Sequence, residues 1–120
     1  MKMELVAFLG VDKENWGQIT ALINRGEWEK VILVKNKSAE AFPVAENCEL
    51  VELYTDKPML ELKEDLMAKL KNKLAGDLEV ALSIASGSGK EHMALISALL
   101  SIPVGIRLVV FTKEGLEFIN

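Results

Sequence analysis

Short apolar runs alternate along the chain with longer segments in which apolar residues recur every three or four positions. The short runs are residues 3–9, 30–35, 49–54 and 78–85. Such runs are typical of strands that helices cover on both faces of a parallel sheet. The longer segments, whose spacing predicts amphipathic helices, are residues 13–25, 58–76 and 88–101. The chain therefore predicts strands and helices in alternation.

Particular residues mark the ends and inner faces of the first two predicted helices. Asp12 is expected to cap the start of the first helix, and Gly26 to close it in the left-handed conformation. The inward face of that helix is predicted to hold Trp16, Ile19, Thr20 and Ile23. Pro58 suits the entry of the second helix. Its apolar stripe is Met59, Leu62, Leu66, Leu70 and Leu74. Residues 38–42 favour a short helical turn that Pro43 interrupts.

The C-terminal part of the chain completes a single α/β domain. Residues 107–111 and 116–120 predict an antiparallel β-hairpin in which Gly115 takes a positive φ. Strand–helix–strand connections join parallel strands by right-handed crossovers. We therefore predict one Rossmann-like domain over residues 1–120, with an open sheet whose core parallel strands follow the order 3-2-1-4 and a C-terminal antiparallel hairpin.

Composition and charge narrow the function classes. The 120 residues carry a net charge of -4, which argues against broad binding of duplex DNA because such binding needs a basic surface to displace counterions. Cys48 is the single cysteine and no Cys/His spacing resembles a zinc site, so we expect a reducing, cytoplasmic setting and neither metal nor cofactor. No apolar run approaches the roughly 18 residues of a membrane helix, and the first residues lack the features of a signal peptide.

The turn between the fourth strand and the third helix carries the clearest candidate chemistry. It reads Ser-Gly-Ser-Gly-Lys and opens directly into the helix. A helix start presents unpaired N–H groups and the positive end of the dipole to one spot, which attracts anions. The glycines allow close approach of a ligand, the serine hydroxyls can donate to phosphate or ribose oxygens, and the lysine adds positive charge. A histidine in the first helical turn can exchange a proton. The candidate ligand-binding residues are Ser86, Gly87, Ser88, Gly89, Lys90 and His92.

The turn after the first strand is expected to join the same site. In the order 3-2-1-4 the first and fourth strands are neighbours, and their crossovers leave toward opposite edges of the sheet. Such a reversal opens a crevice beyond the carboxyl ends of the strands, where ligands bind. The candidate ligand-binding residues of this turn are Gly10, Val11, Asp12 and Lys13.

Structural explanations compete with these roles. Ser88 and Glu91 fit the S-x-x-E capping box, in which they satisfy the N–H groups of the helix itself. A first-turn lysine opposes the dipole, so Lys90 favours a functional role, whereas His92 favours a packing or surface role. The Walker motif G-x-x-x-x-G-K-[ST] needs glycine at position 84 and serine or threonine at position 91, but the chain has Ile and Glu there. The dinucleotide motif G-x-G-x-x-G needs a glycine at position 92, where the chain has His. We therefore expect neither triphosphate hydrolysis nor dinucleotide binding.

The strand, the Ser-Gly-Ser-Gly-Lys turn and a helix with Met-Ala-Leu at residues 93–95 resemble the CARF (CRISPR-associated Rossmann-fold) domains. Those domains carry a Gly-Gly-Thr-Lys-like turn after their fourth strand, and the order of elements agrees over most of the chain. Lys90 matches the lysine of that turn. Ser88 stands where the pattern has glycine and Gly89 where it has threonine, so Ser86 or Ser88 would have to supply the hydroxyl contact.

The resemblance implies a homodimer that binds a cyclic oligoadenylate second messenger across its two-fold axis, as a ligand sensor in CRISPR antiviral defence. A second hypothesis from the same resemblance is a metal-independent ring nuclease with catalytic Lys90 and Ser88, where Lys90 stabilises the phosphorane and Ser88 or His92 orients groups. A third is a regulatory or oligomerisation domain whose turn is only a well-capped helix start. Because family members usually carry a nuclease or a DNA-binding helical domain, the chain is a free-standing sensor, an enzyme or a piece of a longer protein.

Overall fold

The computed structural model describes residues 3–37, 42, 47–76 and 78–120. The strands are β1 (Met3–Leu9), β2 (Trp28–Asn36), β3 (Cys48–Leu53), β4 (Glu79–Ser83), β5 (Gly105–Thr112) and β6 (Gly115–Phe118). The helices are α1 (Trp16–Arg25), α2 (Met59–Lys71) and α3 (Gly89–Ser101), and a 3-10 turn, η1 (Lys13–Asn15), precedes α1. The strands, helices and hairpin that the periodicity predicts are confirmed, with shifts of a few residues at their ends.

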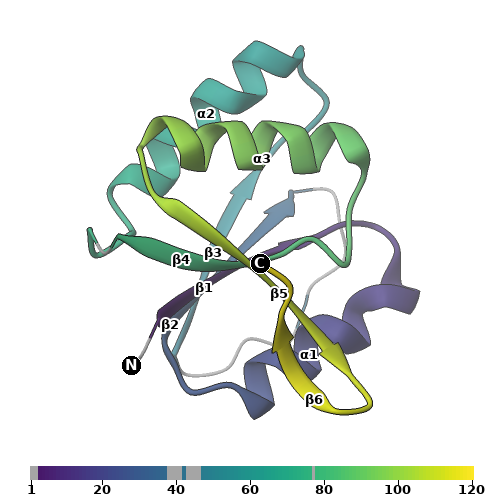
Figure 1. Ribbon diagram of the computed structural model, residues 1–120. Coiled ribbons are helices and arrows are strands. Elements are labelled where there is room, and N and C mark those ends of the chain that lie inside the picture. The colour runs from purple at the N-terminus through teal and green to yellow at the C-terminus, as the bar shows by residue number, and fades with distance from the viewer. Residues whose placement is uncertain (1–2, 38–41, 43–46, 77) are drawn as a thin grey trace.

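One sheet of six strands runs through the molecule in the order β3-β2-β1-β4-β5-β6 (Figure 1). β1 pairs in parallel with β2 on one side and with β4 on the other, and β5 adds in parallel beside β4. β6 folds back antiparallel on β5 through a turn in which Gly115 has a φ of 106°. The predicted core order 3-2-1-4 and the closing hairpin are therefore confirmed.

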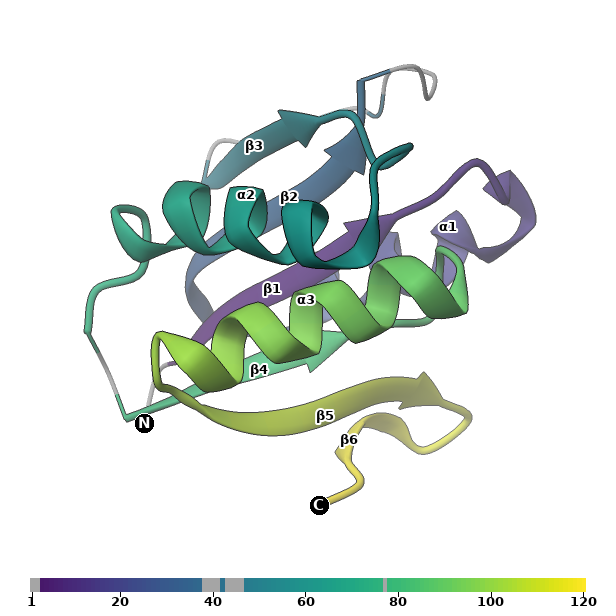
Figure 2. The same ribbon diagram turned by 90° about the horizontal axis from the view of Figure 1, so that it is seen from above.

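Helices cover both faces of this sheet (Figure 2), with α2 and α3 on one face and α1 on the other. Val6 and Phe8 of β1 are buried in the core beneath α2 and α3. Leu5, Ala7 and Leu9 of the same strand are buried in the core beneath α1. A strand buried on both faces reads as a continuous apolar run, which is the pattern that identifies β1 in the sequence.

The start of α1 differs from the prediction. Residues 13–15 form the 3-10 turn η1, so α1 begins at Trp16, and the Asp12 side chain does not cap η1 or α1 by accepting from a backbone N–H group there. The inward face is also shifted, because Leu22 is buried while Thr20 is exposed. The Thr20 hydroxyl donates to the Trp16 carbonyl within the helix at 3.2 Å, which satisfies it at the surface.

The end of α1 is closed by an indole group rather than by a left-handed glycine. Gly26 has extended backbone angles, with φ -88° and ψ 152°, so the predicted left-handed closure is wrong. The Trp28 Nε1–H donates to the Leu22 carbonyl at 2.7 Å. A Cβ atom at position 26 would collide with the Trp28 indole. The glycine is needed because the indole lies against its backbone.

Two further predictions concern residues 38–43 and membrane-spanning helices. The short helical turn at residues 38–42 and the break at Pro43 lie outside the described residues, apart from Phe42, which is buried and packs edge-on against Trp16. Among the helices that the structure describes, none is long and apolar enough to cross a membrane.

Candidate functional site

The turns after β1 and β4 meet at the carboxyl edge of the sheet, as the strand order predicts. β1 and β4 are neighbours, and the chain leaves β1 toward α1 on one face and β4 toward α3 on the other (Figure 2). The two turns touch through their backbones, because a Cβ atom at Gly10 would lie 2.6 Å from the Gly87 Cα atom. This junction is the switch point at which open α/β sheets bind ligands.

Asp12 and Ser86 join the two turns by hydrogen bonds. The buried Ser86 hydroxyl accepts from the Gly10 N–H at 2.9 Å and donates to Asp12 Oδ1 at 2.7 Å. Asp12 Oδ1 also accepts from the Gly87 N–H at 3.0 Å, and Asp12 Oδ2 accepts from Asn15 Nδ2 at 2.7 Å. One carboxylate therefore holds the β4 turn against the β1 turn, instead of capping the first helix.

The same network lowers the pKa of Asp12. Burial raises the pKa of this carboxyl, but the hydrogen bonds donated by Asn15, Ser86 and Gly87 favour the charged form and outweigh it. The net result is a pKa below the ordinary value. Asp12 is therefore a carboxylate at neutral pH and accepts from all of these donors together.

At the start of α3, some backbone N–H groups bond to the capping side chains and others remain available to a ligand. The predicted capping box is present, since the Ser88 hydroxyl accepts from the Glu91 N–H and the Glu91 carboxylate accepts from the Ser88 N–H at 2.8 Å. Among the described residues, the N–H groups of Gly89 and Lys90 have no hydrogen-bond partner, and neither has the exposed Lys90 ammonium. Two amides, an ammonium and the positive end of a helix dipole remain available to an anion.

Gly87 makes the sharp entry into this turn. Its φ is 105°, and a Cβ atom there would lie 2.6 Å from Phe8 Cδ1. Only glycine fits such a backbone conformation against a packed ring. The glycine that the sequence analysis assigns to close approach of a ligand is thus also required by the fold.

His92 supports the turn from beneath. Its Nε2 lies 2.7 Å from the Ser86 carbonyl, and because a carbonyl only accepts, Nε2 carries the proton in this contact. The ring also packs edge-on against Phe8, with 6.4 Å between the ring centroids. The packing interpretation therefore accounts for His92, whose role toward a ligand stays a prediction.

The other predicted residues of the β1 turn lie at the surface beside this junction. Val11 has 78% of its surface exposed, and Lys13 is exposed in η1. Trp16, which the sequence analysis assigns only to packing, donates from its indole Nε1 to the Gly10 carbonyl at 3.0 Å. A tryptophan six residues after a strand-ending glycine carries no motif, so sequence alone does not reveal this contact.

Comparison with known proteins bears on the fold. No protein-family profile and no curated protein matches the chain. Among solved structures, Enterococcus italicus Csm6 bound to cyclic hexa-2'-fluoro-hexa-dAMP is similar, with a TM-score of 0.64 and 16% sequence identity. The match covers 98% of this chain but 35% of the Csm6 chain, so this chain spans a minor part of that protein's length. The likeness supports the Rossmann-like fold that the sequence predicts.

Proposed function

We propose that this domain senses a cyclic oligoadenylate, which binds at the turns after β1 and β4 of a homodimer, in CRISPR antiviral defence. The ligand contacts would come from residues 10–13 and 86–90, together with His92. The observation that carries the proposal is the junction of the two turns, where the Gly89 and Lys90 amides and the Lys90 ammonium are left for an anion.

The chemistry of the junction suits a ring of phosphodiesters. Each linkage of such a ring carries one negative charge, and amide donors at a helix start bind phosphate oxygens without a metal. The similar Csm6 structure holds a ring of this class, and this chain has the fold of a region of that protein. The Asp12–Ser86–Gly87 hydrogen bonds support the proposal because they fix the turn that carries the donors before any ligand arrives.

The proposed homodimer rests on the resemblance to the CARF domains. One chain offers one pair of turns and one Lys90 to the ligand. Two copies related by a two-fold axis would place equivalent turns on opposite sides of it, since a two-fold interface repeats the same surface on both subunits.

Cleavage of the ring stays a prediction. The chromatography experiment below distinguishes cleavage from binding alone. Ser88, the proposed partner of Lys90 in cleavage, already accepts from the Glu91 amide in the capping box. Its hydroxyl proton can still be donated, so the cap leaves a role in orienting a group open. We therefore propose binding alone.

Calorimetric titration with cyclic tetra-adenylate and cyclic hexa-adenylate tests the proposal. We expect at least one ring to bind, and Lys90→Ala to weaken binding by about 1 to 3 kcal/mol, roughly 5- to 150-fold in Kd, because a charge-assisted contact is lost. Lys71→Ala is the matched control, since Lys71 is an exposed lysine at the end of α2, at the opposite edge of the sheet. It should bind like the wild type.

Two outcomes contradict binding at this site. If neither ring gives heat at either of two temperatures, the sensing function is refuted. If the Lys90→Ala and wild-type proteins bind with equal affinity, the turn is only a helix cap in a regulatory domain. Chromatography of the rings after long incubation reports cleavage. A ring with 2'-fluorine in place of the 2'-hydroxyl lacks the internal nucleophile, so it measures binding without cleavage.

A further inference from the structure

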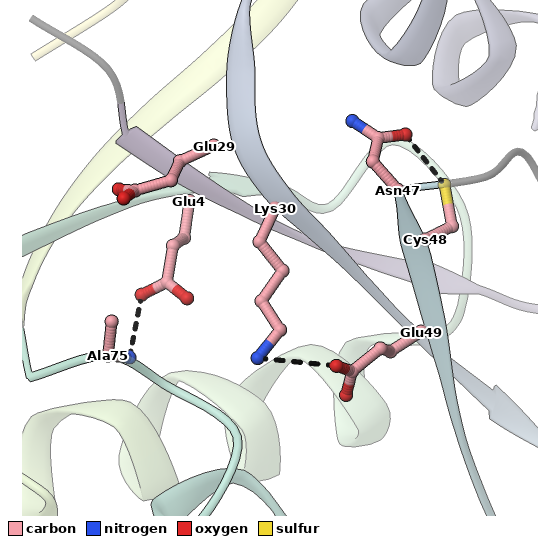
Figure 3. A pocket seen from close by; sticks show the side chains of 7 residues that line it. All are labelled: Glu4, Glu29, Lys30, Asn47, Cys48, Glu49 and Ala75. Carbon is pink, nitrogen blue, oxygen red and sulfur yellow. Dashed lines mark hydrogen bonds and ion pairs between the residues drawn. The ribbon is translucent and has the colours of Figure 1, made fainter.

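A second candidate site lies at the amino edge of the sheet, opposite the junction of the two turns. Here the first residues of β1, β2 and β3 and the segment after α2 surround an open pocket of about 390 Å³ (Figure 3). The pocket is lined by Glu4, Glu29, Lys30, Asn47, Cys48, Glu49 and Ala75. Its size falls within the range of small-molecule sites.

Glu4 is the unusual residue of this pocket, because its side chain is buried with half of its carboxylate unpaired. Only 1% of Glu4 is exposed. Its Oε1 accepts from the Ala75 N–H at 3.0 Å, whereas its buried Oε2 has no hydrogen-bond partner. Figure 3 shows one carboxylate oxygen directed to Ala75 and the other on the side of Lys30, in the pocket. Buried polar atoms nearly always have a hydrogen-bond partner, so we expect a donor to bind this oxygen.

The nearest lysine is committed to other groups. Lys30 stands directly opposite Glu4 in the β1–β2 register. Its Nζ donates instead to the Lys73 carbonyl, two residues beyond the end of α2, and pairs with Glu49 at 3.4 Å. Glu49 also pairs with the Lys73 ammonium at 3.3 Å. Lys30 therefore neutralises Glu49 and the helix end, and leaves Glu4 without an ion pair among the described residues.

The electrostatics of the pocket favour a cation that donates hydrogen bonds. Glu49 pairs with the ammonium groups of both Lys30 and Lys73, whereas the Glu4 and Glu29 carboxylates of the lining have no ion pair among the described residues. The carboxyl end of α2 adds the negative end of a helix dipole. No group of three or more His, Cys, Asp or Glu side chains in the described part of the chain is arranged to hold a metal ion. The expected cation is therefore organic.

We infer that this pocket binds a small organic cation through a primary ammonium or guanidinium group, which donates a hydrogen bond to Glu4 Oε2. Glu29 adds a second carboxylate at the mouth of the pocket, where it is exposed. The site does not depend on the proposed binding of a cyclic oligoadenylate, because it lies at the other edge of the sheet.

Titration with agmatine, which carries both a guanidinium and an ammonium group, tests the inference. In nitrogen–proton spectra of the wild-type protein, we expect the Ala75 amide to shift saturably with agmatine up to about 10 mM, because its acceptor Glu4 gains a second hydrogen-bond partner at Oε2. Glu4→Gln, which removes the charge but keeps the shape, should weaken agmatine binding at least about tenfold. Glu64→Gln, at an exposed position of α2, is the matched control and should bind like the wild type.

Several results would overturn the inference. One is an unchanged Ala75 amide, which would mean that water alone satisfies Glu4. Another is equal affinity of the Glu4→Gln and wild-type proteins. A third is a saturable response to magnesium chloride at the same amides. If Glu4→Gln does not fold, the titration of the wild-type protein still shows whether agmatine binds beside Ala75. Lys90→Ala should bind agmatine normally, so failure here and failure of oligoadenylate binding are distinguishable.

Discussion

Replacing Ser86 by alanine should separate the two turns at the carboxyl edge of the sheet. Ser86 is fully buried and its hydroxyl serves the Gly10 N–H and Asp12 Oδ1 together. Without the hydroxyl, the buried Gly10 N–H loses its acceptor, which costs about 1 to 3 kcal/mol. Asp12 keeps its donors from Gly87 and Asn15 and is only half-buried, so water replaces the lost bond at little cost. We expect a loss of about 2 kcal/mol in the free energy of unfolding.

Ser83, the last residue of β4, provides a matched control three residues before Ser86. It is as buried as Ser86, with 1% of its surface exposed, but its hydroxyl has no hydrogen-bond partner. Removing an unpaired buried hydroxyl is neutral or stabilising, so Ser83→Ala should not lower stability. With a urea dependence of about 2 kcal/mol per molar, Ser86→Ala should lower the unfolding midpoint by about 1 M. Equal midpoints for the two variants would refute the role of Ser86 as the link between the turns.

Two further predictions concern the same turns. The pKa of Asp12 is lowered in the folded protein, so its carboxylate contributes stability above the pKa of the unfolded chain and loses it as the pH falls through the folded pKa. In urea unfolding, the stability difference between wild type and Asp12→Asn should thus be largest near neutral pH and shrink in acid; a difference that is constant with pH would contradict this. Gly87→Ala places a Cβ at a φ of 105° and 2.6 Å from Phe8 Cδ1, and should cost at least about 2 kcal/mol. Gly89→Ala is its control, because a Cβ at Gly89 meets nothing within 4 Å; equal melting temperatures for the two would be the contrary result.

Most of this fold can be predicted from local sequence patterns, because the residues that bury or cap an element lie mostly within that element. β1 is apolar at every buried position except Glu4, and the Ser88–Glu91 pair caps α3 within one turn. The strand order 3-2-1-4 is an inference from the fold class, because periodicity identifies the strands but not their sequence in the sheet; that order places β1 and β4 side by side. The meeting of the two turns at Gly10 and Gly87 could therefore be predicted without coordinates.

The remaining features depend on partners far along the chain. An aspartate before a helix can accept from the helix start or from any other donor, and Asp12 accepts from Ser86 and Gly87, more than 70 residues away. The Trp28 indole fixes Gly26 in an extended conformation, although the pattern of a glycine after a helix favours the left-handed one. Likewise, nothing in the β1 sequence shows that the Glu4 carboxyl group is buried and accepts from the Ala75 N–H.

The most direct test of ligand sensing at the junction is a nitrogen–proton titration of the wild-type protein with cyclic tetra-adenylate and cyclic hexa-adenylate. We predict that the amides of Gly89 and Lys90 shift most, because they are the donors at the start of α3 that the protein leaves unpaired among its described residues. The amides of residues 10–13 should follow. Largest shifts at the amino edge of the sheet, or no shifts with either ring, would contradict the proposed site.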